Sequence, residues 1–312
     1  MGTNLIRDMQ LGSATAEART PACEPLPRPP WLSETAWPFP MVSLRVDDSK
    51  VAVTSVGSGP ALLFVHTGLC SIIWRDLISL LAADFRCVCL DAPGTGLSER
   101  LPPGRIDLDH AARAVSAVIT ELELENLVLI VHDLGGLTGL AGVAELPERV
   151  RGIVAVNTFA WRPADFRFRA MLALMANPLV REFDAGTGLL ARITATSFGA
   201  GRNLDPTGRR ALRRAIDRDG LRAFHQLMRD ALRSQTIYAR VDRALTDQFQ
   251  RLPLLTIFGE RNDPFAFQKQ WKSLFPDARQ VVVPDGHHFP MCDDPALVAA
   301  SIRGWYRHVV AA

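Results

Sequence analysis

The sequence predicts an α/β protein whose central sheet is mostly parallel and carries helices on both faces, with a helical segment inserted before the penultimate strand. From Val42 onward, short apolar runs alternate with segments of helical periodicity, which is typical of parallel sheets. The first runs follow one another without a helix between them, so the sheet is expected to begin as an antiparallel hairpin. From Trp161 to Gln250 the pattern is Arg-rich and helical, with no convincing strand.

The expected strands are short runs of Val, Ile, Leu and other apolar residues bounded by turn-forming residues. They cover residues 42–46, 51–56, 61–66, 86–91, 127–131, 152–157, 253–258 and 279–283. The expected helices show apolar residues recurring at three- and four-residue spacing. They cover residues 74–83, 108–122, 135–146, 265–274 and 295–309.

Composition excludes several classes of function. The 312 residues are 48% hydrophobic and 22% charged with a net charge of +2, which predicts a globular protein that binds neither nucleic acid nor a membrane. The five cysteines show no metal-ligand spacing, so no metal is expected. The first residues contain no continuous apolar core, so no secretory signal is expected, and no run is long enough to predict a membrane span. A cytoplasmic monomer or homodimer is therefore the default expectation.

The segment from Leu127 to Gly142, L-V-L-I-V-H-D-L-G-G-L-T-G-L-A-G, carries the strongest functional signal. A buried strand, a sharp turn and a Gly-rich helix start form the context of a nucleophile elbow, whose usual signature is G-x-S-x-G. Asp133 occupies the place of the serine. A carboxylate is a poor acyl-transfer nucleophile, but it can displace a leaving group from an sp3 carbon and form an alkyl ester. Asp133 therefore favours hydrolysis of carbon–halogen or epoxide bonds over ester hydrolysis.

A cap follows from the position of the helical segment after this elbow. Residues 31–160 and 251–312 are expected to form the α/β core, and residues 161–250 a helical cap that excludes water and lines the substrate pocket. Residues 1–30 are polar and then Pro-rich, which predicts a flexible N-terminal arm. The expected partners are a small apolar substrate and water.

Three further segments supply candidate site residues. In L-F-V-H-T-G-L, the backbone N–H of Gly68 or a neighbour would join that of Leu134 to hold the charge of a tetrahedral intermediate. Asp263 follows a buried strand, where it either holds the tautomer of a histidine or caps the helix after Pro264. Position and chain order favour the first role.

Two adjacent histidines, His287 and His288, follow the last expected strand. An alkyl-enzyme ester needs a base that activates water, and a histidine is the usual base. The sequence after His288, F-P-M-C-D-D-P, favours His288, and the alternative His287 stays open. His132 precedes the nucleophile and is expected to point away from the elbow tip.

Taken together, these residues resemble the haloalkane dehalogenase family of α/β-hydrolases, from Pro30 to the end of the chain. The resemblance is carried by W-L-S-E-T-A-W-P-F-P, V-H-D-L-G-G, D-A-P-G-T-G-L-S, V-A-V-N-T-F-A-W and H-F-P-M-C-D-D-P. It implies displacement of halide by Asp133, then hydrolysis of the ester with His288 as base and Asp263 as its partner. No cofactor is implied.

The chain departs from the family at both usual halide contacts. Leu134 stands where the family has a tryptophan, and Gly68 where it has an asparagine or glutamate. Each lost N–H donor is worth roughly 1.5–3 kcal/mol for a charged leaving group. Thr67 and Trp161 are the candidate replacements.

Two alternatives stay open. An epoxide hydrolase would share the Asp nucleophile, but it needs two cap tyrosines, and this chain has only Tyr238 and Tyr306. A catalytically weak or non-catalytic protein that binds a small molecule would explain the lost halide contacts. The complete set of Asp133, Asp263 and His288 favours an active hydrolase.

Overall fold

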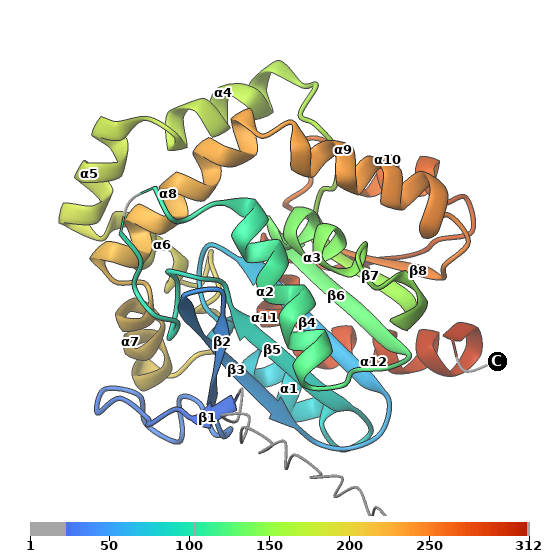
Figure 1. Ribbon diagram of the computed structural model, residues 1–312, viewed down its shortest axis with the longest axis horizontal. Coiled ribbons are helices and arrows are strands. Elements are labelled where there is room, and N and C mark those ends of the chain that lie inside the picture. Colours follow the sequence, from blue (N-terminus) through green and yellow to red (C-terminus); the bar gives the residue numbers. More distant parts are fainter. Residues whose placement is uncertain (1–22, 103, 311–312) are drawn as a thin grey trace, which may run out of the picture.

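The computed structural model describes residues 23–102 and 104–310, which form a nine-stranded sheet in the order β1-β2-β3-β5-β4-β6-β7-β8-β9 (Figure 1). The strands from β5 to β9 in that order pair in parallel, and β1, β2 and β3 pair antiparallel at one edge. The strands are β1 (Cys23–Pro25), β2 (Val42–Val46), β3 (Ser49–Val56), β4 (Ala61–Thr67), β5 (Arg86–Asp91), β6 (Leu127–Asp133), β7 (Val150–Thr158), β8 (Leu254–Gly259) and β9 (Arg279–Val283). The predicted fold class and the initial hairpin are confirmed.

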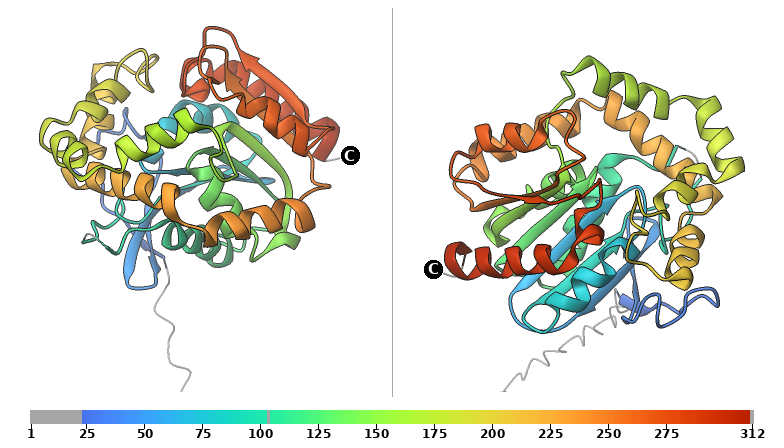
Figure 2. Two further views of the ribbon diagram at one scale, coloured as in Figure 1. Left: turned by 90° about the horizontal axis from the view of Figure 1, so that it is seen from above. Right: turned by 180° about the vertical axis from the view of Figure 1, so that it is seen from behind.

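Helices cover both faces of this sheet (Figures 1 and 2). One layer contains α2 and α3, which pack against each other, and the other contains α1 and α12. The core helices are α1 (Arg75–Leu81), α2 (Leu108–Glu121), α3 (Gly135–Val143), α10 (Phe267–Leu274), α11 (Pro290–Asp293) and α12 (Pro295–Trp305). Short 3₁₀ and π segments are η1 (Ser71–Trp74), η2 (Pro147–Arg149), η3 (Ala244–Gln248) and η4 (Tyr306–Val310). None of the helices in the described part of the chain could cross a membrane.

The central strands are apolar on both faces because helices cover both. All of β4 is buried, as is β6 up to its last residue. Glycine lets α3 lie close to β4, since a Cβ at Gly135 would stand 2.2 Å from the carbonyl oxygen of Val65. This contact fixes the start of α3 directly after the end of β6.

The segment between β7 and β8, residues 159–253, consists of helices and the loops that join them, with no strand, and is called the helical insertion below. Its helices are α4 (Phe166–Met175), α5 (Pro178–Thr187), α6 (Leu189–Thr194), α7 (Pro206–Ala215), α8 (Arg218–Arg233) and α9 (Thr236–Arg243). Side chains of Asp165, Asn177, Asp205 and Asp217 accept N–H groups at the starts of α4, α5, α7 and α8. Figure 2 shows α4 to α7 projecting beyond one side of the sheet.

The structure differs from the expected flexible arm at residues 23–30. Cys23–Pro25 pairs with β2, and the Leu26 N–H donates to the carbonyl oxygen of Met41 at 3.0 Å. The Arg28 guanidinium then holds the carbonyl oxygen of Trp37 at 2.6 Å. Backbone pairing and this cation therefore fix a segment whose proline content predicted an arm. Residues 1–22 lie outside the described residues.

Candidate active site

Asp133 lies at the tip of a strained turn between β6 and α3. Its φ of +53° is a left-handed conformation that most side chains avoid but that aspartate tolerates. The Thr158 hydroxyl donates a 2.5 Å hydrogen bond to the Asp133 carbonyl oxygen and so holds the turn from β7. A Cβ at Gly136 would stand 2.2 Å from the carbonyl oxygen of Phe159, so the turn requires glycine there. The fold thus forces the Asp133 side chain out of the sheet.

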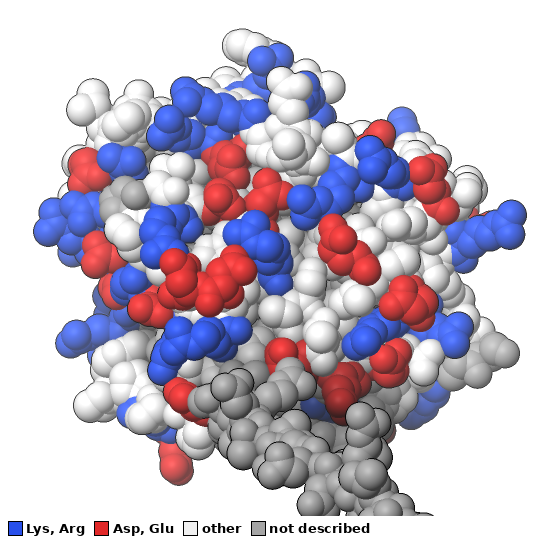
Figure 3. All heavy atoms as spheres, in the orientation of Figure 1, with Lys and Arg blue, Asp and Glu red and all other residues white. Residues whose placement is uncertain are grey.

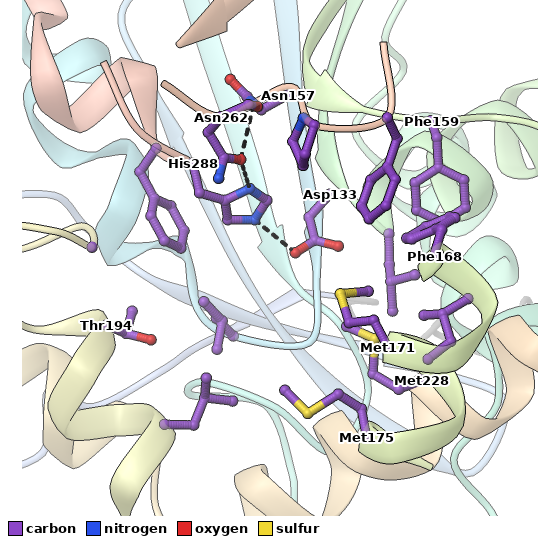
Figure 4. A pocket seen from close by; sticks show the side chains of 18 of the residues that line it. Asp133, Asn157, Phe159, Phe168, Met171, Met175, Thr194, Met228, Asn262 and His288 are labelled. Carbon is purple, nitrogen blue, oxygen red and sulfur yellow. Dashed lines mark hydrogen bonds and ion pairs between the residues drawn. The ribbon is translucent and has the colours of Figure 1, made fainter. Parts of the chain in front are cut away.

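The structure brings Asp133 and His288 together (Figure 4). His288 Nε2 lies 3.0 Å from Asp133 Oδ2, and the Asp133 side chain exposes 18% of its surface. Burial opposes ionisation of this carboxyl, but the hydrogen bond and the charge of His288 hold its pKa well below the usual range. Asp133 is therefore a carboxylate at neutral pH.

An amide, rather than a carboxylate, faces the other ring nitrogen of His288. His288 Nδ1 lies 3.2 Å from Asn262 Oδ1. Asn157, at the end of β7, fixes the orientation of this amide, because its own oxygen accepts the Gly259 N–H at 2.8 Å. Its Nδ2 therefore donates to Asn262, at 2.6 Å to the carbonyl and 3.3 Å to Oδ1. Asn262 Oδ1 is thus an acceptor, so His288 carries a proton on Nδ1.

The structure does not place Asp263 against His288. Its two carboxylate oxygens accept the N–H groups of Phe267 at 2.7 Å and Gln268 at 3.0 Å, at the start of α10. The prediction that Asp263 would hold the histidine therefore differs from the structure, and the capping role is the observed one. The unpaired N–H groups of a helix start compete for a nearby carboxylate, and here they hold both of its oxygens. Sequence reasoning missed Asn262 and Asn157 because it looked for an ionisable partner.

The predicted leaving-group and oxyanion residues divide into two groups. Leu134 is fully buried and lines the cavity described below, and Leu69, next to Gly68, lines it too. Thr67 and Trp161 do not line it. The Thr67 hydroxyl pairs with that of Thr138 at 2.6 Å, inside the core. The Trp161 ring packs on Phe267 and Trp271, with centroids 5.7 and 5.3 Å away. Neither predicted replacement donor therefore reaches the cavity.

A cavity of about 470 Å³ separates the Asp133 carboxylate from the helical insertion. Its walls are mostly apolar and include several phenylalanines, and the labelled side chains of Met171, Met175 and Met228 lie on one side of it (Figure 4). Its polar side chains are those of Asp133, Asn157, Thr194, Asn262, Asp263 and His288. No tryptophan or tyrosine lines it among the residues that the structure describes. Such a cavity fits a small apolar molecule next to the Asp133 carboxylate.

Two buried histidines lie beneath this site. His132 Nε2 faces the carbonyl oxygen of His288 at 2.8 Å, and its Nδ1 faces His66 Nδ1 at 3.0 Å. A carbonyl only accepts, so His132 carries its proton on Nε2, and its Nδ1 accepts from His66 Nδ1–H. Burial lowers the pKa of His66 to about 4 and that of His132 well below its usual value. These hydrogen bonds connect β4 and β6 to the loop that carries His288. His132 points away from the cavity, as expected.

The low pKa of His66 predicts acid-sensitive stability. The folded pKa of about 4 lies below the reference value of 6.5, so the unfolded chain binds more protons between these values. His66 then lowers the free energy of unfolding by up to about 3 kcal/mol as the pH falls from 6.5 to 4. Urea unfolding at a series of pH values measures this loss. In His66→Asn, which keeps a donor for His132, the pH dependence should be shallower. The exposed His308→Asn control should behave as the parent, and equal slopes in all three proteins would refute the assignment to His66.

Comparison with known proteins identifies the family of the chain and several relatives. A family model described as alpha/beta hydrolase fold matches residues 60–295. Haloalkane dehalogenase 2 of Mycobacterium tuberculosis is 28% identical over 282 residues, covering 85% of this chain and 94% of that protein. A cis-3-alkyl-4-alkyloxetan-2-one decarboxylase of Shewanella oneidensis is 28% identical over 172 residues, covering 52% of this chain and 54% of that protein.

Solved structures share the fold. A putative ancestral haloalkane dehalogenase aligns with a TM-score of 0.72 at 22% identity, covering 86% of this chain and 99% of that one. A putative epoxide hydrolase from Pseudomonas aeruginosa aligns with a TM-score of 0.72 at 21% identity, covering 86% of this chain and 95% of that one. At these identities the likeness shows the architecture and leaves the reaction to the site itself.

Proposed function

The chain belongs to the alpha/beta hydrolase fold family. We propose that it hydrolyses carbon–halogen bonds of small apolar molecules through an alkyl ester of Asp133. The observation that carries the proposal is the Asp133 carboxylate itself. It stands at the tip of the turn after β6, ionised, 3.0 Å from His288, and faces an apolar cavity. The dehalogenase relative that covers most of the chain supports the same chemistry.

In the first step, an oxygen of Asp133 attacks the halogen-bearing carbon. The new carbon–oxygen bond forms as the carbon–halogen bond breaks, and the halide leaves with the bonding pair. The apolar walls hold a substrate of matching polarity against the carboxylate, and the helical insertion acts as the cap that separates it from bulk water.

In the second step, water attacks the carbonyl carbon of the ester while His288 Nε2 takes its proton. Alkylation removes the negative charge that faces Nε2, so this nitrogen no longer pairs with a carboxylate and can accept the proton of water. Asn262 keeps the other proton on Nδ1. The backbone N–H groups around Leu69 and Leu134 stabilise the tetrahedral oxyanion. Its collapse breaks the bond between the carbonyl carbon and the alkyl oxygen, and the proton held by His288 passes to the leaving alkoxide to give the alcohol. The carboxyl group then loses its proton to water, which restores the Asp133 carboxylate.

Epoxide opening is less favoured because, among the described residues, no tyrosine lines the cavity to donate a proton to the epoxide oxygen. The Tyr238 hydroxyl donates to the Ala231 carbonyl oxygen at 2.6 Å, and its ring does not line the cavity. Tyr306 lies in η4, beyond α12. No other tyrosine exists in the chain.

A second candidate reaction is the opening of a four-membered lactone. The observation that favours it is the lack of a tryptophan donor for halide on the cavity wall among the described residues. When Asp133 opens a lactone at its sp3 ring carbon, the leaving carboxylate stays on the same molecule. The decarboxylase relative is named for such a ring, an oxetan-2-one.

Trapping the ester tests both reactions. His288→Phe removes the base, so the alkyl ester should accumulate when the protein meets bromoalkanes, epoxides or a dialkyl oxetan-2-one. Intact mass and peptide mapping then identify the adduct on Asp133. An alkyl group without halogen supports dehalogenation, and addition of the whole lactone supports the second candidate.

The neighbouring histidine offers a matched control. The His287 N–H donates to Asp293 at 2.6 Å, and its ring packs near Phe198 rather than against Asp133. His287→Phe should therefore accumulate no ester. Absence of every adduct in a folded His288→Phe protein would refute the proposal, and trapping in His287→Phe alone would make His287 the base.

A further inference from the structure

The helical insertion carries an unusual amount of exposed apolar surface. Of the twelve large apolar side chains that are exposed among the described residues, eight lie between Phe166 and Phe198. They form the apolar insertion surface, which consists of Phe166, Met171, Leu174, Leu179, Phe183, Leu189, Ile193 and Phe198. Phe166 and Leu179 each expose 81% of their surface. Single exposed apolar residues are normal, but a group of this size on adjacent helices marks an interaction site.

Helical spacing shows that this exposure is organised. Leu179 and Phe183 are four residues apart on α5, and Leu189 and Ile193 are four apart on α6, so each pair shares one helix face. The other faces of these helices are already packed against the protein, as the buried Asp184 and Ala191 show. The exposed side chains are therefore a second apolar face and not part of the core.

The same stretch is positively charged. Between residues 161 and 202 there are six arginines and three acids. Each acid has a local partner: Asp165 pairs with Arg167, Glu182 pairs with Arg181 and Arg222, and buried Asp184 contacts His225. Arg169 and Arg192 are exposed and form no ion pair with any described residue. Figure 3 shows Lys and Arg atoms gathered at the top of the molecule, where Figure 1 places α4.

The apolar insertion surface continues into the cavity. Met171 on α4, Ile193 on α6 and Phe198 after α6 are exposed and also line the cavity. An apolar molecule that touches this surface therefore has an apolar path to Asp133.

We propose that the apolar insertion surface docks on an anionic lipid surface, with the cavity opening toward the lipid. Helices with exposed apolar side chains and arginines bind the boundary between headgroups and acyl chains. A second copy fits less well, because a two-fold contact would bring Arg169 and Arg192 of both copies into one interface and set like charges together. The sequence prediction of no membrane partner is based on the whole-chain charge of +2, which averages away this local excess.

Vesicle flotation of the purified full chain tests this docking independently of any catalytic activity. The protein should bind phosphatidylcholine vesicles that contain phosphatidylglycerol and bind pure phosphatidylcholine vesicles much less. Leu179→Ser combined with Phe183→Ser, which leaves the cavity wall intact, should weaken binding roughly tenfold or more. Arg169→Gln combined with Arg192→Gln should weaken it by a similar factor at low salt.

Matched pairs outside the apolar insertion surface serve as controls. Leu274→Ser with Val282→Ser removes two exposed apolar side chains that lie elsewhere on the protein. Arg251→Gln with Arg307→Gln removes two exposed positive charges, as many as Arg169→Gln with Arg192→Gln does. Both should bind vesicles like the parent. Absence of binding to the anionic vesicles, or equal loss in the control pairs, would overturn the proposal. A dimer seen by light scattering that Leu179→Ser with Phe183→Ser dissociates, without vesicle binding by the parent, would assign the surface to a second copy.

Discussion

Replacing Asp133 with asparagine is expected to abolish turnover, by at least about 10⁴-fold, without unfolding the protein. An amide oxygen cannot displace a leaving group and form the ester, so the first chemical step is lost. Many other residues line the cavity, and Asn262 and His132 still contact His288 in this variant. Product release from the substrate that labels Asp133 in the trapping experiment measures the loss.

The fold should tolerate this replacement because asparagine accepts the local backbone geometry. Asn is among the residues that adopt positive φ, as the +53° at position 133 requires, and the Thr158 bond goes to the backbone carbonyl. Alanine would combine the loss of the carboxylate with backbone strain, so Asp133→Asn is the cleaner variant. Its thermal unfolding should match that of the parent within a few degrees.

Asp263→Asn is the matched control, since it makes the same chemical change one loop away. Asn caps a helix nearly as well as Asp, and the structure shows the Asp263 oxygens on the N–H groups of α10. Turnover should stay within about tenfold of the parent. A loss as large as that of Asp133→Asn would restore Asp263 to the role that the sequence predicted.

The elements around Asp133 could be predicted because their signals are local. The run Leu127–Val131 is apolar on both faces, as a central parallel strand must be, and the glycines after Asp133 match the close approach of α3 to β4. The elbow therefore follows from a few adjacent residues. The helical insertion could be predicted for the same reason, because the capping residues and the apolar spacing of each helix lie within a few adjacent residues.

The partner of His288 could not be predicted because it depends on contacts between distant segments. Asn262 and Asp263 are adjacent, and only the direction of each side chain distinguishes them. The N–H groups at the start of α10 donate to Asp263, and Asn157 from β7 orients the Asn262 amide toward His288. Trp161 fails as a donor for a similar reason, since Trp271 from α10 packs against it. Pairwise packing of this kind has no periodic trace in the sequence.

Replacing Asn262, the partner of His288, with aspartate gives the second large expected effect. Asn262→Asp should accelerate hydrolysis of the alkyl ester by about 10²-fold, while leaving the alkylation step nearly unchanged. A carboxylate opposite Nδ1 stabilises the imidazolium that forms as His288 takes a proton from water. The converse change, carboxylate to amide, lowers turnover of a Ser-His-Asp triad by about 10⁴-fold.

The site is already prepared for this charge. Asn157 Nδ2 lies 3.3 Å from Asn262 Oδ1 and would donate to the new carboxylate as it does to the amide. Rapid-quench measurements separate the steps, since ester should accumulate in the parent and disappear faster in Asn262→Asp. Asn157→Asp is the control, because it removes the donor and sets a carboxylate against the Asn262 oxygens. If ester hydrolysis were unchanged in Asn262→Asp, or faster in both variants, the Asn262–His288 contact would not govern the base. A gain confined to Asn262→Asp would show that the amide at this position limits the rate at which His288 activates water.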